Sequence, residues 1–134
     1  FDIVFIDGLH LYEQTIRDII NSWNCLNLHG VIVIHDCLPR SAEMGLRKRV
    51  TRQWTGDVWK AIIWFRKAYP QVNCSVVNID YGCGVIIKSI SEILIIPDGG
   101  NEYKDLDFDW LQSNLNLLNI RNREEVFSMF SNNK

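Results

Sequence analysis

The chain has 134 residues, of which 47% are hydrophobic and 22% charged, and its formal net charge at pH 7 is −2. This apolar content is enough for one globular core, and the nearly balanced charge gives no electrostatic reason to expect nucleic acid or an anionic membrane as a partner. No apolar run reaches the roughly 18 residues that cross a bilayer, and four cysteines without a CxxC pair are typical of free thiols in a reducing compartment, so we expect a cytoplasmic protein.

Two apolar runs near the start of the chain each end on titratable residues. Residues 3–7 predict a strand that is buried on both faces, and residues 31–35 predict a second. Between them, apolar residues recur at helical spacing over 11–26, and His29-Gly30 predicts the end of that helix. A strand, a helix and a strand in this order form a βαβ unit, in which the two strands are parallel.

A long polar connection follows, over residues 37–55, and residues 42–51 within it are a candidate helix. Connections of this length inside compact domains are often functional. The next helix is predicted over 57–69, with Thr55 or Asp57 as its cap. Three tryptophans around it are expected in the core and one lysine in solvent: Trp54, Trp59, Trp64 and Lys60.

The second half of the chain predicts a hairpin and a helical tail. Residues 74–79 and 84–88 read as two strands joined by a tight turn, and 93–96 as a short further strand. Helices are expected over 108–118 and 123–130. The last is preceded by a capping-box pair, Asn122 and Glu125.

The titratable residues at the two strand ends are the candidate site. Asp7 and His10 follow the first strand, and His35 and Asp36 end the second. Because ligands bind beyond the carboxyl ends of parallel strands, these side chains are expected to converge. They would hold a divalent cation or place a base beside a substrate hydroxyl. Successive strand residues point to opposite faces, so His35 and Asp36 both face the site only if the strand has already ended.

Each of these residues also has a purely structural interpretation. Asp7 would cap the following turn, and Asp36 would accept hydrogen bonds from loop amides. His10 would be an ordinary residue at a helix start, and His35 a histidine satisfied within the core.

Two segments, FDIVFIDGLHLYE and LNLHGVIVIHDCLP, resemble the fourth and fifth strand regions of class I S-adenosylmethionine-dependent methyltransferases. The predicted hairpin is similar to the antiparallel sixth and seventh strands of that family. The resemblance covers residues 1–88 and implies an α/β fold: a partial Rossmann-like sheet of two parallel strands plus an antiparallel hairpin, with flanking helices. Residues 1–96 would be the C-terminal half of the methyltransferase-like domain, and 97–134 a helical C-terminal extension.

The IDGxHxYE and HD motifs are most similar to bacterial small-molecule methyltransferases that are related to cation-dependent O-methyltransferases. This resemblance implies a small polar acceptor, with Asp7, His35 and Asp36 as ligands of Mg²⁺ or Mn²⁺. It further implies that Asp7 and Gly8 contact S-adenosylmethionine, and that His10, His35 and Asp36 take part in catalysis. His35 stands where the family has an acid, and Asp36 where it has an amide. A nitrogen ligand weakens the case for magnesium and leaves manganese, iron or no metal open.

The glycine-rich loop and the acid that bind the methyl donor in the family are not found in these residues. We therefore expect the C-terminal part of a methyltransferase, inactive in isolation, whose first strand has an unpaired and aggregation-prone outer edge. Two other interpretations remain open: a non-catalytic interaction module and a metal-dependent hydrolase.

Overall fold

The structure is a computed structural model that describes residues 1–131, with the backbone alone at residues 98, 99 and 131. Within this range the strands form one five-stranded sheet in the spatial order β1-β2-β4-β3-β5. The strands are β1 (Ile3–Ile6), β2 (Val31–Ile34), β3 (Asn73–Val77), β4 (Cys83–Ile87) and β5 (Ile120–Arg121). The helices are α1 (Tyr12–Cys25), α2 (Val58–Ala68), α3 (Phe108–Ser113) and α4 (Arg123–Ser131), with short 3-10 helices η1 (Pro97–Gly100) and η2 (Leu115–Leu118).

The strand pairing confirms the predicted α/β architecture, a partial Rossmann-like sheet. β1 and β2 are parallel and are connected through α1. β2 pairs antiparallel with β4, and β3 and β4 form the predicted hairpin. The C-terminal segment adds one strand that the sequence did not predict. This strand, β5, pairs parallel with β3 over two residues. A segment of that length has no detectable hydrophobic period.

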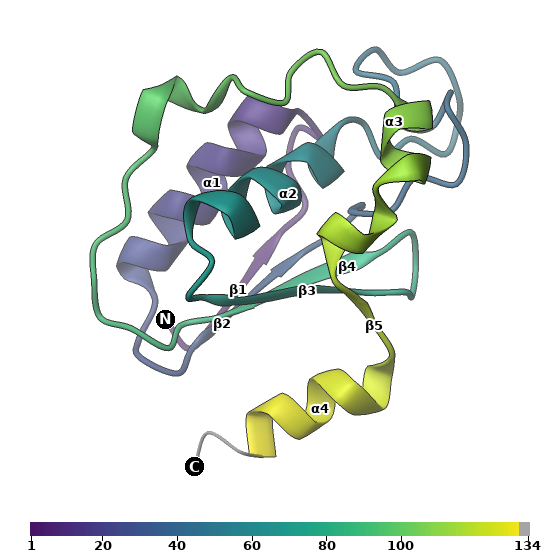
Figure 1. The fold of residues 1–134 in the computed structure, drawn as a ribbon. Helices are drawn as coiled ribbons and strands as arrows, with labels where there is room; N and C mark the ends of the chain where they lie inside the picture. Colours follow the sequence, from purple (N-terminus) through teal and green to yellow (C-terminus); the bar gives the residue numbers. More distant parts are fainter. Residues whose placement is uncertain (132–134) are drawn as a thin grey trace.

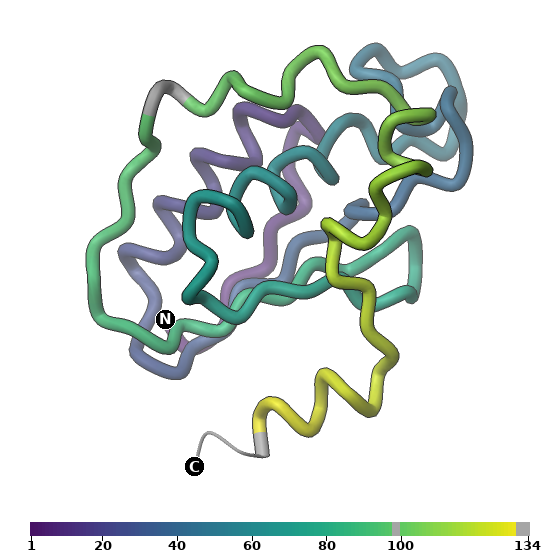
Figure 2. Tube along the Cα trace, viewed as in Figure 1, coloured from purple at the N-terminus to yellow at the C-terminus, as the bar shows by residue number. Residues whose placement is uncertain are grey.

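Helices α1 and α2 lie side by side over one face of the sheet (Figure 1, Figure 2). On α1 the apolar residues recur at helical spacing and form one buried stripe that includes Ile16, Ile19 and Trp23. On α2, residues 58–65 are all buried, since this helix also packs under the C-terminal segment. The main core therefore lies between these two helices and the sheet.

The opposite face of the sheet is covered unevenly. α4 packs Val126 against Val77, Val85 and Ile87 of the hairpin, and Figure 1 shows this helix on the side of the sheet away from α1 and α2. β1 is at the edge of the sheet, as predicted, with β2 as its neighbour. On β1 the apolar side chains of Ile3 and Phe5 stay exposed, as does that of Phe1 before the strand.

The connection between β2 and α2 differs from its prediction. No helix forms over 42–51, because the Met44 carbonyl accepts from Thr55 N at 3.0 Å and from Gly56 N at 3.1 Å instead of from a residue one turn later. Asp57 precedes α2, but its carboxyl caps a different helix, since Tyr12 N of α1 donates to Asp57 Oδ1 at 2.6 Å. The connection is therefore folded back onto the start of α1.

Residues 93–96 form no strand. The backbone groups of Leu94 and Ile95 bond to side chains instead: Asn24 donates to the Leu94 carbonyl and accepts from Leu94 N, both at 3.1 Å, and Ile95 N donates to the Tyr69 hydroxyl. The helix predicted over 108–118 is divided at Asn114, whose N–H bonds to Leu111 O. The predicted capping box is present, with both of its hydrogen bonds at 2.8 Å.

The turn before β2 contains a glycine for a reason other than helix termination. His29 has the positive φ of 67°, whereas a Cβ on Gly30 would lie 2.7 Å from Leu26 Cγ and 3.0 Å from Asp2 O. Gly30 is therefore needed for a close approach of three segments.

The cysteines, Lys60 and the lengths of the helices test three further expectations from the sequence. All four cysteines are free, as predicted. Lys60 was expected in solvent but is buried, where its Nζ donates to the Lys104 carbonyl. None of the helices within residues 1–131 is long and apolar enough to cross a membrane.

Candidate active site

The ends of β1 and β2 bring the predicted residues to one edge of the sheet. Ile6 and Ile34 are register partners, and His35 N donates to Ile6 O at 2.9 Å, so Asp7 and His35 leave the sheet at the same level. β2 ends at Ile34, and Asp36 takes a left-handed backbone with φ 61°. The strand has thus ended before His35, so the side chains of His35 and Asp36 both face the site.

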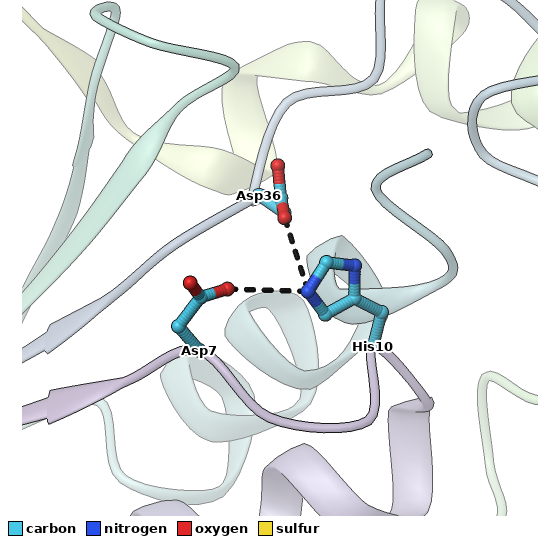
Figure 3. A group of neighbouring side chains, drawn as sticks. All are labelled: Asp7, His10 and Asp36. Atoms are coloured by element: carbon cyan, nitrogen blue, oxygen red, sulfur yellow. Dashed lines mark hydrogen bonds and ion pairs between the residues drawn. The ribbon is translucent and has the colours of Figure 1, made fainter. Parts of the chain in front are cut away.

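Four side chains converge there. His10 Nε2 lies 3.2 Å from Asp7 Oδ1 and 3.2 Å from Asp36 Oδ2 (Figure 3). His35 Nδ1 lies 3.7 Å and 3.3 Å from the same two oxygens. Asp7, His10 and Asp36 each offer a potential ligand atom, and these atoms are all within 4.8 Å of one another. His35 is not one of these three, although its Nδ1 lies within 3.7 Å of both carboxylates. We call Asp7, His10, His35 and Asp36 the rim cluster.

The outer nitrogen of each histidine has a partner of its own. His10 Nδ1 is 3.0 Å from the Trp54 carbonyl, and because a carbonyl only accepts, Nδ1 carries the hydrogen. The His10 ring also stacks on Trp54, with ring centroids 5.2 Å apart. His35 Nε2 is 3.1 Å from Asp80 Oδ2. These contacts leave His10 Nε2 and His35 Nδ1 facing the two carboxylates.

Glycines on neighbouring segments hold His10 and Asp36 in place. A Cβ on Gly56 would lie 2.0 Å from the His10 carbonyl oxygen, and one on Gly82 would lie 2.7 Å from Leu38 N. The loop after Asp36 is tied to the β3–β4 turn, since Cys37 N donates to Gly82 O at 2.9 Å. His10 itself has φ 55°. Strained non-glycine backbone of this kind is concentrated at functional sites.

Burial governs the electrostatics of the cluster. The Asp36 side chain is 9% exposed, and burial raises its pKa, although the positive charges of His35 and His10 act in the opposite direction. Burial also disfavours the charged form of His35, but the hydrogen bond to Asp80 and the charges of Asp36 and Asp7 outweigh it and raise the pKa of His35. A desolvated carboxylate beside imidazole nitrogens is stabilised by a cation or a proton at the centre of the group.

The spacing of the donors fits a metal ion. With metal–ligand bonds of about 2.1 Å, adjacent ligands lie about 3.0 Å apart in octahedral and about 3.4 Å apart in tetrahedral geometry. The nitrogen–oxygen separations of 3.2 to 3.7 Å in the rim cluster are close to this range. Of these four approaches, the one between His10 and Asp7 has hydrogen-bond geometry.

Gly8 lies beside the cluster, on a groove between β1 and α1. The groove is lined by Asp7, Gly8, Asp18, Asn21 and Ser22 together with the outer edge of β1. Its carboxylate, amide and hydroxyl groups fit hydrogen bonding to a polar part of a bound molecule. Within residues 1–131, no glycine-rich turn joins a strand to a helix in the manner of a phosphate or dinucleotide loop.

Three residues that contact the site histidines were not predicted from the sequence: Trp54, Gly56 and Asp80. Asp80 was read as part of a hairpin turn, and Trp54 was expected in the core, where Trp59 and Trp64 do lie. Trp54 is instead half-buried against His10. Gly56 carried one signal, a glycine directly before a helix cap, which is compatible with several turn geometries.

Comparison with known proteins gives one family. Residues 1–37 match a family model described as a methyltransferase domain. The matched segment contains β1, α1 and β2 and all four residues of the rim cluster, whereas Trp54 and Asp80 lie outside it. No curated protein and no solved structure matches the chain. The family match supports a methyltransferase in general, and with it chemistry of the S-adenosylmethionine type.

Proposed function

We propose that this chain carries the acceptor-activating part of an S-adenosylmethionine-dependent methyltransferase, which transfers a methyl group to an oxygen of a small polar molecule. One observation supports this most: the segment that matches a methyltransferase domain contains a cluster of two carboxylates and two imidazoles, with nitrogen–oxygen separations of 3.2 to 3.7 Å.

Methyl transfer to a hydroxyl requires an in-line approach and the loss of the hydroxyl proton. A divalent cation such as Mg²⁺ or Mn²⁺ would supply a lowered hydroxyl pKa and a fixed orientation. Asp7 and Asp36 provide carboxylate oxygens for such an ion. The inner nitrogens of His10 and His35 lie at the same point, where they serve as further ligands or accept the proton. Asp7 and Gly8 lie on the groove beside β1 and are assigned to the methyl donor.

The test is an assay of methyl transfer from S-adenosylmethionine by the full protein that carries this chain, with catechol as the probe acceptor. We expect product formation that a chelator abolishes and that added Mn²⁺ restores. Asp36→Asn should abolish transfer, while Glu124→Gln, which removes a charge from α4, should not change it. Hydrolysis of ester or phosphate probes without S-adenosylmethionine would favour the metal-dependent hydrolase instead.

A second candidate function is supported by the edge of the sheet. Ile3 and Phe5 of β1 are exposed, as is Phe1 before it, and the outer edge of β1 is unpaired in the described chain. An apolar edge strand is a template for a strand from another polypeptide. A binding module would be favoured if the protein captured such a strand and the rim cluster could be mutated without consequence for its activity.

A further inference from the structure

In each histidine of the rim cluster, the ring nitrogen that faces away from the carboxylates has a hydrogen-bond partner. This feature bears on the kind of ion that the site binds. A metal-bound histidine usually donates its other ring N–H to a carboxylate or to a backbone carbonyl, which fixes the tautomer and aims the free nitrogen. His35 has the first kind of partner in Asp80, at 3.1 Å. His10 has the second kind in the Trp54 carbonyl, at 3.0 Å.

These two partners come from parts of the chain far from the cluster. Trp54 is 44 residues from His10 and belongs to the connection before α2, and Asp80 is 45 residues from His35 and belongs to the turn between β3 and β4. Asp80 has a left-handed backbone with φ 40°, and the turn that carries it is bonded to the loop after Asp36. Two independent segments are thus folded so that each orients one imidazole.

We infer that the rim cluster is a site with two nitrogen and two oxygen donors, which selects a transition-metal ion such as Mn²⁺, Co²⁺ or Zn²⁺ over Mg²⁺, and that Asp80 is the positioning residue for its second nitrogen. Imidazole suits transition metals, whereas Mg²⁺ is a hard ion that requires oxygen ligands and retains its waters. Asp7 and Asp36 alone would suit Mg²⁺. The addition of His10 Nε2 and His35 Nδ1 at 3.2 to 3.7 Å changes the preference.

This inference rests on the proposal that the cluster holds a cation, but it does not require methyl transfer. With both imidazoles as ligands, neither accepts the acceptor's proton, which leaves to solvent on the side of Asp7. That route is open because the Asp7 side chain is 47% exposed.

The experiment is calorimetric titration of the purified chain with Mg²⁺, Mn²⁺, Co²⁺ and Zn²⁺ in separate runs at one pH. We expect Co²⁺ and Zn²⁺ to bind at least about tenfold more tightly than Mg²⁺. Pulsed paramagnetic resonance of the Mn²⁺ form should show couplings to imidazole nitrogen. Equal affinities for Mg²⁺ and Co²⁺, or a Mn²⁺ spectrum without nitrogen couplings, would overturn the inference.

Variants of Asp80 test the positioning role. Asp80→Gly keeps the positive φ but removes the acceptor, so Co²⁺ affinity should fall by about 10- to 100-fold, with a weaker nitrogen coupling in the Mn²⁺ spectrum. Asp80→Asn retains an acceptor oxygen and tolerates this backbone, so most of the affinity should return. Glu124→Gln on α4 is the control for loss of one negative charge. If Asp80→Gly binds Co²⁺ as tightly as the wild type while its circular dichroism is unchanged, Asp80 does not position His35.

Failure of this inference and failure of the proposed function give different results. If methyl transfer runs with Mg²⁺ and the Mn²⁺ form shows no nitrogen couplings, the proposed function stands and the metal preference is wrong. Tight Co²⁺ binding that depends on Asp80, in a protein that transfers no methyl group, would do the reverse.

Discussion

The face of the sheet under α1 and α2 and the rim at the ends of β1 and β2 are built in opposite ways. Under the helices, residues such as Trp23 and Ile62 are apolar and have no exposed surface. At the rim, Asp36 is a buried carboxylate with a left-handed backbone, and His10 is kept in place by groups more than 40 residues away. The first region supplies the free energy of folding. The second consumes part of it to hold polar groups close together, which is typical of a ligand site.

The largest effect is expected in the helix-covered face. Trp23→Ala removes a fully buried indole from α1, and the free energy of unfolding should fall by about 3 to 5 kcal/mol. Urea unfolding followed by circular dichroism measures this loss. Ile3→Ala, at a side chain that is 70% exposed on β1, is the control and should change little. If both variants lose the same amount, the core does not lie where the structure places it.

Gly56→Ala should displace His10 at the rim without changing any residue of the core. The new Cβ would overlap the His10 carbonyl and sit on a backbone with φ 59°, so we expect a loss of about 2 to 3 kcal/mol in unfolding free energy. Metal affinity should fall as well, because His10 must move. Gly45→Ala in the same connection is the comparison, since its Cβ would meet Pro39 at 3.3 Å on an ordinary backbone. An equal response of the two variants would argue against a special role for Gly56.

Tyr12, the first residue of α1, belongs to the main core and gives a smaller, pH-dependent effect. Its hydroxyl is buried without a well-formed hydrogen bond among the described residues, and burial raises the pKa of Tyr12 from 10.0 to about 12, although the nearby Tyr103 backbone acts in the opposite direction. The folded state therefore holds this proton more tightly than the unfolded state does. Stability should fall as pH rises from 10 to 12, as the unfolded state ionises first.

The variant Tyr12→Phe should remove that alkaline loss and should be more stable at neutral pH by up to about 1 kcal/mol, since no polar group remains unsatisfied. Urea unfolding at pH 7 and pH 11 measures both effects. Tyr69→Phe is the matched control, because the Tyr69 hydroxyl bonds to the Ile95 backbone and its removal should destabilise the protein. A Tyr12→Phe variant that is less stable at both pH values would show that this hydroxyl has a partner.

The smallest change in stability is expected at the β1 edge. Ile3→Lys places a charge on an exposed apolar edge, and the free energy of unfolding should change by less than about 0.5 kcal/mol. Light scattering after size-exclusion chromatography should show less association than in the wild type, with a mass nearer the 15.6 kDa of one chain. Gln14→Lys adds the same charge on α1, away from the edge, and should leave association as it was.

The parts of the fold that follow from local patterns were predictable. The stripe of α1, the parallel pair β1–β2 and the β3–β4 hairpin each follow from periodicity or turn composition within one segment. Residues 93–96 have an equally apolar sequence, but the backbone of Leu94 and Ile95 bonds to Asn24 and Tyr69, so no pattern within the segment could predict its conformation. Lys60 lies within the buried stretch of α2, residues 58–65, and its burial depends on the distant Lys104 carbonyl.

The same distinction applies to the site. Asp7 and Asp36 could be brought together from sequence, because the ends of adjacent parallel strands meet at one edge. Their neighbours Trp54 and Asp80 could not, since each approaches from a separate loop with no periodic signal. The structure brings the side chains together, but the roles of Asp7, Gly8, His10, His35 and Asp36 stay predictions.

The central claim is that Asp7, His10, His35 and Asp36 form one ion-binding cluster, and calorimetric titration with Mn²⁺ tests it most directly. The wild-type chain should bind one ion, and Asp7→Asn and Asp36→Asn should each lose this binding by more than about 100-fold, since even outer partners of metal ligands are worth 10- to 100-fold. Binding by both variants that equals the wild type, or no binding by the wild type, would contradict the account.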